Sequence, residues 1–134
     1  MKILIVENDR ILTKVWEKRL SKENEINVAY NVHEALNLLE HNYVPDLLFL
    51  DLRLNGPHDM HTNGLTIYSN VRKINKKTPI AIITGLDAAT SLYQKAAKIV
   101  AVDDFAVILE KPISLSEIKS LINGTHEFKS IITK

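Results

Sequence analysis

The polar side chains best suited to chemistry follow directly after four short apolar runs of the sequence. They are Glu7, Asn8 and Asp9 after the first run, Asp51 after the second, Thr84 after the third, and Glu110 and Lys111 after the fourth. Together they supply carboxylates, a hydroxyl and an ammonium. Such a set suits metal-assisted transfer of a phosphoryl group onto a carboxylate, because a metal and an ammonium offset the phosphoryl charge while a hydroxyl donates a hydrogen bond to it.

The four apolar runs predict the strands that must position these groups, at residues 3–6, 47–50, 80–83 and 106–109. They are too short for buried helices and do not alternate polar with apolar residues, which is typical of parallel strands covered on both faces. A weaker run at residues 26–30 suits a strand at the edge of the sheet.

Between the runs, apolar residues recur at helical spacing and predict helices at residues 9–22, 32–41, 64–74 and 88–100, with a fifth that begins after residue 114. Asn31 and Ser114 each precede an acid at the capping-box spacing, Asp87 is the predicted N-cap of the fourth helix, and Gly124 ends the last one. The apolar stripe of the first helix contains Ile11, Leu12, Val15, Trp16 and Leu20, and we interpret Trp16 as a core residue.

Strands that alternate with helices predict an α/β fold, a doubly wound five-stranded parallel sheet flanked by five helices. In such open sheets, ligands bind beyond the carboxyl ends of the strands, where the strand order reverses. The polar residues named above all stand at those ends. The sequence therefore predicts that they gather at one rim of the sheet.

Composition limits the class of protein. The chain has 134 residues, 46% hydrophobic and 25% charged, with a formal net charge of +1 and no cysteine. This length suits one domain, and the missing cysteines exclude disulfides, cysteine-ligated zinc and thiol catalysis. The balanced charge argues against direct nucleic-acid binding, and no signal peptide or membrane-spanning run is present. We expect a cytoplasmic domain that does not enter membranes.

Four segments carry a resemblance to a known family. They are Ile-Leu-Ile-Val-Glu-Asn-Asp at 3–9, Pro-Asp-Leu-Leu-Phe-Leu-Asp-Leu at 45–52, Ala-Ile-Ile-Thr-Gly at 81–85 and Leu-Glu-Lys-Pro at 109–112. In this order they resemble the receiver domain of two-component response regulators, and residues 31–36 look like that family's entry into the second helix. The resemblance implies a flavodoxin-like, CheY-like three-layer sandwich. It covers residues 1–124 and leaves 125–134 as a helical extension or tail.

The resemblance also implies roles for single residues. Asp51 would accept a phosphoryl group from a sensor histidine kinase or phosphotransfer protein, and the domain would then change its affinity for a downstream protein. Glu7, Asp51 and the backbone carbonyl of Arg53 would hold Mg²⁺. Thr84 and Lys111 would stabilise the phosphoryl group.

Supporting roles in the same resemblance fall to two further residues, Gly85 and Pro112. Gly85 would keep access to the acceptor open, and Pro112 would follow a cis peptide bond that aims Lys111 inward. The resemblance allows a homodimer through the face of the fourth and fifth helices. It implies a phosphorylated switch with self-dephosphorylation, not a further enzyme.

The chain departs from the family pattern at two positions. Asn8 stands where a metal-ligating acid is expected, so we expect weaker Mg²⁺ binding; Asp9 would compensate only if the loop shifted by one residue. Ile108 stands where the family often has Tyr or Phe, a ring whose inward movement reports phosphorylation. Phe105 comes three residues too early to replace it.

The chain is also longer than the family pattern in two places, residues 55–64 and the span from Thr84 to Lys111. The second span predicts either an extended fourth helix or a changed loop. His58 and His61 in the first segment are interpreted as solvated residues rather than metal ligands. Phe128, Ile131 and Ile132 would either continue the last helix or form a tail that binds a partner.

Two alternative functions remain open at this stage. A degenerate receiver would bind proteins without phosphorylation, which Asn8 and Ile108 favour. A phosphatase of the haloacid-dehalogenase kind would need a second Asp two residues after Asp51, where this chain has Arg53.

Overall fold

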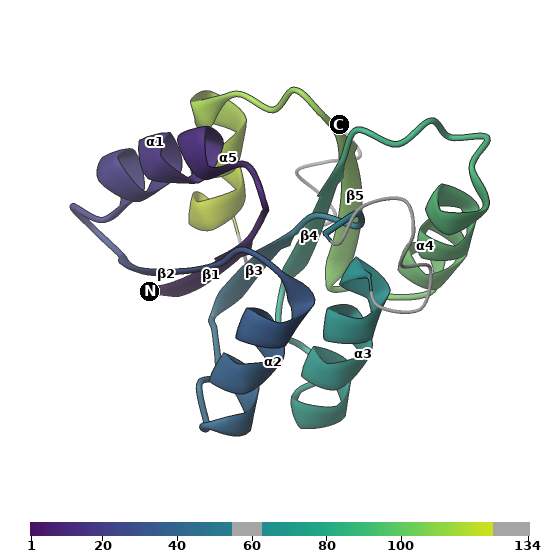
Figure 1. The fold of residues 1–134 in the computed structure, drawn as a ribbon, viewed down its shortest axis with the longest axis horizontal. Coiled ribbons are helices and arrows are strands. Elements are labelled where there is room, and N and C mark those ends of the chain that lie inside the picture. Colours follow the sequence, from purple (N-terminus) through teal and green to yellow (C-terminus); the bar gives the residue numbers. More distant parts are fainter. Residues whose placement is uncertain (55–62, 125–134) are drawn as a thin grey trace.

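The computed structural model describes residues 1–54 and 63–124, and within them strands and helices alternate along the chain (Figure 1). The strands are β1 (Lys2–Val6), β2 (Glu25–Ala29), β3 (Leu47–Leu50), β4 (Ile80–Thr84) and β5 (Ala106–Glu110). The helices are α1 (Arg10–Leu20), α2 (Val32–Glu40), α3 (Gly64–Ile74), α4 (Ser91–Ala101) and α5 (Leu115–Asn123). Each predicted element is present.

All five strands form one parallel sheet in the order β2-β1-β3-β4-β5. The order reverses between β1 and β3, which places the predicted ligand crevice beyond the ends of these two strands. The predicted fold class, a doubly wound sheet flanked by five helices, is confirmed. The weak run does form an edge strand, β2, although it ends at Ala29 and leaves Tyr30 outside.

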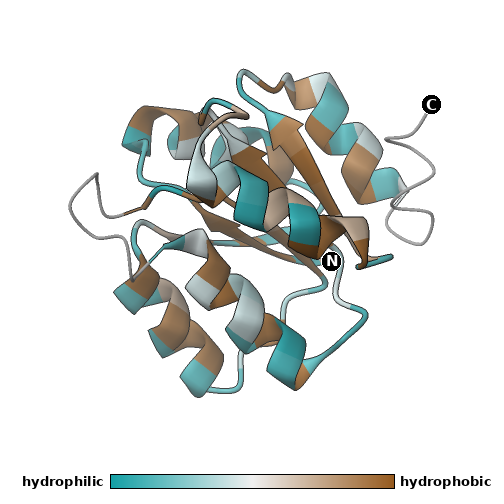
Figure 2. Cartoon of the chain, turned by 90° about the vertical axis from the view of Figure 1, so that its right-hand side faces the viewer, coloured by the Kyte–Doolittle hydropathy of each residue, from teal (hydrophilic) through white to brown (hydrophobic). Residues whose placement is uncertain are grey.

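The sheet is covered on both faces, as its continuous apolar strands require (Figure 1). One face packs against α2, α3 and α4 through residues such as Leu4, Leu50 and Ile82. The other face packs against α1 and α5 through residues such as Ile5 and Phe49. In Figure 2 the strands inside are largely hydrophobic, while each helix carries both colours. The two cores together fix the strand ends relative to one another.

Helix α1 packs on the sheet with only part of the predicted apolar stripe, because Leu12, Trp16 and Leu20 contact the core but Ile11 and Val15 do not. Trp16 is a core residue as predicted, 4% exposed, and its ring centroid lies 6.3 Å from that of Phe49. Thr13 is fully buried beside it, whereas Ile11 is 80% exposed and Val15 is 50% exposed. The prediction that Ile11 and Val15 belong to the packed stripe is therefore wrong, because the helix contacts the sheet through Thr13, Trp16 and Leu20.

The N-caps of α2 and α5 lie where the sequence indicates, but that of α4 does not. Asn31 accepts a hydrogen bond from the Glu34 amide, and Ser114 forms a complete capping box with Glu117. The predicted cap of α4, Asp87, instead accepts from the Ala89 amide in a turn, and Thr90 caps the helix. This turn delays the start of α4.

The additional residues between Thr84 and Lys111 therefore do not extend α4 toward the rim. Residues 85–90 form a loop that precedes α4, and the helix runs only from Ser91 to Ala101. Within this span the structure therefore has a loop before α4 rather than a helix that begins at residue 88.

At the opposite end of the sheet, one arginine ties three segments together. The Nε atom of Arg72, near the end of α3, lies 2.7 Å from Oδ2 of Asp103 in the loop before β5. The same guanidinium donates to the carbonyl oxygens of Thr78 and Phe105, and the Tyr68 hydroxyl donates to Asp103. Both charged side chains are largely buried, 14% and 13% exposed.

Several predictions fall outside the described residues. These concern His58 and His61, most of the long segment 55–64, the tail with Phe128, Ile131 and Ile132, and the boundary at 124. Among the helices described, none combines the length and the apolar character that crossing a membrane requires.

Candidate functional site

The centre of the rim is a pair of buried carboxylates at the ends of two neighbouring strands. Glu7 follows β1 and Asp51 follows β3, and the Asp51 amide donates to the carbonyl of Val6 at 3.0 Å. Glu7 is 3% exposed and Asp51 is 6% exposed. Burial without a cation would penalise both charges, so the pair needs a positive partner.

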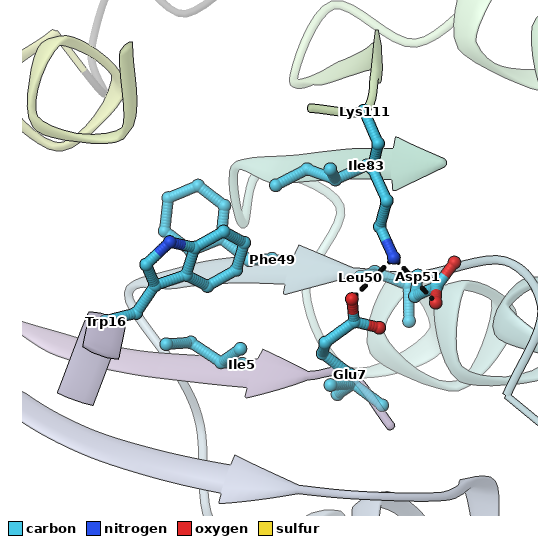
Figure 3. A pocket seen from close by; sticks show the side chains of 9 residues that line it. Ile5, Glu7, Trp16, Phe49, Leu50, Asp51, Ile83 and Lys111 are labelled. Carbon is cyan, nitrogen blue, oxygen red and sulfur yellow. Dashed lines mark hydrogen bonds and ion pairs between the residues drawn. The ribbon is translucent and has the colours of Figure 1, made fainter. Parts of the chain in front are cut away.

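Lys111 supplies that partner from the end of β5. Its Nζ atom lies 2.5 Å from Oε1 of Glu7 and 3.3 Å from Oδ2 of Asp51 (Figure 3). The Lys111 amide donates to the Thr84 carbonyl at 2.9 Å, which holds the lysine beside β4. The Lys111–Pro112 peptide bond is cis, as the resemblance implied. When both acids are ionised, one negative charge of this cluster remains unmatched.

The electrostatics of the site follow from this burial. Burial, with the Asp51 carboxylate as a neighbour, raises the pKa of Glu7 to about 7 despite the opposing effect of Lys111. Burial alone would lower the pKa of Lys111, but its hydrogen bond to Glu7 and the negative charge of Asp51 raise it. The lysine therefore stays charged, and Glu7 holds a proton more readily than an exposed glutamate does.

Thr84 ends β4 beside this cluster and is fully buried. Its Oγ1 accepts a hydrogen bond from the Leu86 amide at 3.0 Å, which fixes the side chain at the start of the loop. An open hollow of about 280 Å³ lies next to it, lined by residues 84–88, Glu110 and Lys111. Gly85 is exposed at this hollow, and a Cβ built there would lie 3.8 Å from Cδ of Lys111. The hollow is therefore open to solvent at Gly85, while the Thr84 side chain itself stays buried at its edge.

The oxygen donors that could hold a divalent cation come from β1 and β3. Glu7 and Asp51 supply carboxylates, and Arg53 is exposed two residues beyond Asp51 and donates its amide to Oδ1 of that acid at 3.3 Å. Asn8 is exposed and its backbone amide donates to Oε2 of Glu7 at 3.1 Å. Two carboxylates, an amide oxygen and a backbone carbonyl fit a hard cation such as Mg²⁺, with less negative charge than three acids would give.

No cluster of three or more His, Cys, Asp or Glu side chains suitable for a metal occurs in residues 1–54 and 63–124. Asp9 caps α1, because its Oδ1 accepts from the amides of Ile11 and Leu12 at 3.0 Å. This is the structural role that its position at a helix start favours.

Ile108 lies within β5, whereas Phe105 comes just before the strand begins. Ile108 is half-buried and packs against the core on the α4 face together with Leu92 and Ile99. Phe105 precedes β5, and its carbonyl accepts from the Ile80 amide at the amino end of β4. Phe105 therefore lies at the edge of the sheet opposite the rim.

Leu52, Leu54 and Gly64 lie near Asp51, and no role at the site was predicted for them from the sequence. Leu52 and Leu54 alternate with Arg53 and are both buried in the core. Gly64, the first residue of α3, packs directly on the backbone of Asp51 and Leu52. The signal that could have indicated Gly64 is its type, because glycine is a poor helix former and here stands directly after the cap Asn63.

Beneath the charged cluster the side chains are apolar. Trp16 and Phe49 lie to one side of the Lys111 ammonium, with Ile5 and Ile83 near them (Figure 3). The sequence has a single tryptophan, so fluorescence of the protein reports on Trp16 at the base of this site.

A doubly wound parallel sheet with acids, a threonine and a lysine at the carboxyl ends of its strands is the arrangement of the receiver class of signalling domains. Residues 3–123 match the response regulator receiver domain family, so the chain belongs to that family. The sequence matches none of the curated proteins with which it was compared.

Solved structures show the same fold at low sequence identity. An adenylate cyclase from Rhodopirellula baltica has a TM-score of 0.74 at 23% identity, with 98% of this chain and 91% of that one covered. A CheY-like response regulator receiver domain protein from Methanospirillum hungatei JF-1 has a TM-score of 0.71 at 20% identity. The match covers 93% of this chain and 95% of that one. The receiver domain of the Francisella response regulator 1452 has a TM-score of 0.67 at 22% identity. The match covers 97% of this chain and 98% of that one.

Proposed function

We propose that this receiver domain accepts a phosphoryl group on Asp51 from a phosphohistidine of a sensor kinase or phosphotransfer protein, with Mg²⁺ as cofactor. The observation that carries the proposal is the bridging position of Lys111, whose ammonium reaches both Glu7 and Asp51. A positive group held at that position can neutralise a phosphoryl group on Asp51, since fixed charges in a water-poor site act strongly.

In the transfer, an oxygen of the Asp51 carboxylate bonds to phosphorus while the phosphorus–nitrogen bond of the donor imidazole breaks. The product is an acyl phosphate, and the electron pair of the broken bond returns to the imidazole. The Lys111 ammonium then pairs with the new phosphoryl oxygens, and the Thr84 hydroxyl donates a hydrogen bond to them. Gly85 leaves the approach to the acceptor unobstructed.

Glu7, Asp51, the Asn8 amide oxygen and the Arg53 carbonyl would hold the Mg²⁺, which neutralises phosphoryl oxygens when bound. Asn8 contributes an oxygen without negative charge, and the cation must share Glu7 with Lys111. The proposal therefore includes weak Mg²⁺ binding and slow phosphorylation.

The partners in this proposal are proteins. Phosphorylation would change the affinity of the domain for a downstream protein in the cytoplasm, without direct contact to nucleic acid, and a homodimer through α4 and α5 is one form of that change. The likeness to an adenylate cyclase is one of fold at 23% identity. Cyclase chemistry is therefore not part of the proposal, nor is any enzymatic activity beyond self-dephosphorylation.

Incubation with acetyl phosphate or beryllofluoride tests the proposal directly. Mass spectrometry should show one magnesium-dependent adduct that is absent from Asp51→Asn, whose side chain has nearly the same size. Exposed Asp104→Asn is the matched control and should still form the adduct. No adduct on the wild-type chain at millimolar magnesium would overturn the proposal.

A degenerate receiver that binds proteins without phosphorylation is the second candidate. The observation that favours it is Ile108, an aliphatic side chain that packs against the core on the α4 face. It has no aromatic ring that could move inward together with the Thr84 side chain and so report phosphorylation. Binding of the same protein partner with equal affinity by the wild type and by Asp51→Asn would support it.

A further inference from the structure

The backbone that carries the phosphoryl acceptor is held from two sides. Leu52, which is fully buried, and Leu54, 4% exposed, anchor the segment after Asp51 in the core on the α2–α4 face. Between them only Arg53 is exposed. The acceptor and the proposed carbonyl ligand thus belong to one short segment whose alternate side chains point into the protein.

On its second side, the backbone of this segment contacts Gly64, the first residue of α3. The Gly64 amide donates to the Leu52 carbonyl at 2.9 Å. A Cβ built on Gly64 would lie 2.4 Å from the Asp51 carbonyl oxygen and 2.9 Å from Cα of Leu52. Both neighbours are backbone atoms rather than flexible side-chain ends. A side chain at position 64 therefore cannot be accommodated unless α3 or the acceptor segment moves.

We propose that Gly64 is a positioning residue for the acceptor site: its bare backbone sets where the Asp51 carboxylate and the Arg53 carbonyl stand relative to Glu7 and Lys111. This rests on the proposed function of Asp51. Gly64 touches neither metal nor phosphoryl group and acts through the backbone it packs against. The remaining glycine of the rim differs, because a Cβ on Gly85 meets only a lysine methylene at ordinary contact distance.

The consequence is a mechanical link between α3 and the site. Residues 51–54 and the first turn of α3 behave as one body, because the amide hydrogen bond and the close backbone contact join them. Shifts of several tenths of an ångström at an acceptor matter, since misplacement by about 1 Å can cost on the order of 100-fold in rate. Gly64→Ala should therefore impair the site beyond its effect on folding.

The experiment compares Gly64→Ala with Val71→Ala, a variant of the same helix whose buried side chain packs in the core further along α3. Both variants should lose thermal stability. Only Gly64→Ala should slow acyl phosphate formation from acetyl phosphate, by about 10-fold or more. It should also weaken Mg²⁺ binding, followed by Trp16 fluorescence, and shift the amide resonances of Leu52 and Arg53.

Equal Mg²⁺ affinity and equal phosphorylation rate in the two variants would overturn the proposal, because Gly64 would then be merely structural. Should Gly64→Ala not fold, Leu52→Val takes its place, since it loosens the same segment without a clash. Wild-type Mg²⁺ affinity in that variant would likewise overturn it.

The amide resonances separate this proposal from the proposed function. If the wild type forms no acyl phosphate, the function of Asp51 fails, whereas a perturbed Arg53 amide in Gly64→Ala would still support Gly64 as the residue that positions the segment.

Discussion

Asn8 is a neutral residue at a position where a metal-ligating acid is expected. Its effect on Mg²⁺ binding can be measured by a single substitution. Its side chain is exposed beside Glu7, so the position has access to an incoming cation. Asn8→Asp should strengthen Mg²⁺ binding roughly tenfold, because an ionised carboxylate replaces a neutral amide next to a hard cation. Titration calorimetry measures this. The exposed Asn37→Asp on α2 adds the same charge elsewhere and should leave the affinity unchanged.

Lys111 is the second residue whose replacement has a definite expected outcome. Lys111→Met removes the only cation that the described structure places against Glu7 and Asp51, so the unliganded protein should lose about 1–2 kcal/mol of unfolding free energy. Mg²⁺ should bind severalfold more tightly, because no ammonium competes for Glu7. Urea unfolding with and without magnesium tests both effects. An unchanged affinity would show that lysine and metal do not compete; exposed Lys95→Met serves as the control.

At the residue scale, much of the site followed from the sequence. Strand-end positions identified Glu7, Asp51, Thr84 and Lys111, because each lies within two residues of the end of an apolar run. The steric role of Gly64 did not, since nothing in its neighbours along the chain indicates that α3 returns onto the Asp51 carbonyl.

Among the elements, α3 is joined to the segments that precede β4 and β5 by Arg72 and its ion pair with Asp103. Breaking a largely buried pair leaves a charge without its partner. Asp103→Asn should therefore lower the unfolding free energy by about 3–5 kcal/mol, as chemical denaturation would show. The neighbouring Asp104→Asn is exposed and should change it little. Equal stability of the two variants would contradict this role for Arg72.

The same pair predicts a pH dependence. Burial opposes ionisation of Asp103, but hydrogen bonds from Arg72 and Tyr68 and the charge of Arg72 outweigh it and lower the pKa. A lowered pKa in the folded state contributes stability above the unfolded pKa, ordinarily near 3.9, and this stability is lost as the pH falls through the folded value. The stability difference between wild type and Asp103→Asn should thus shrink below about pH 4. A difference that is constant from pH 3 to 7 would argue against it.

Helix α1 shows why element faces are harder to predict than elements. Its apolar residues cover more than one face, so spacing alone allowed Ile11 and Val15 to be packed. The helix instead buries Thr13, whose hydroxyl donates to the Arg10 carbonyl and so needs no water. The rotation of a helix about its own axis depends on which side chains can pack on the sheet. In α1 the packing of Trp16 next to Phe49 sets that rotation.

For the whole molecule, the net charge of +1 yields a prediction about nucleic acid. Nucleic-acid affinity depends on cations that neutralise phosphates, and the acids of this chain offset nearly all of its lysines and arginines. Fluorescence anisotropy with a duplex DNA at low salt should show a dissociation constant no tighter than about 100 µM. Saturable, strongly salt-dependent binding in the low micromolar range would contradict this expectation.

The order of strands and helices, the parallel sheet and the residues at its rim all follow from the sequence. These are local patterns: short apolar runs, helical spacing and the polar residue that ends each run. Parallel topology then brings the carboxyl ends of the strands to one edge. Other features arise only from packing in three dimensions. They are the nearer approach of Lys111 to Glu7 than to Asp51, the rotation of α1, the Arg72 contacts and the packing of Gly64 on the Asp51 backbone. Each of these depends on the distance and angle between segments far apart in the chain, which packing sets and no local pattern encodes.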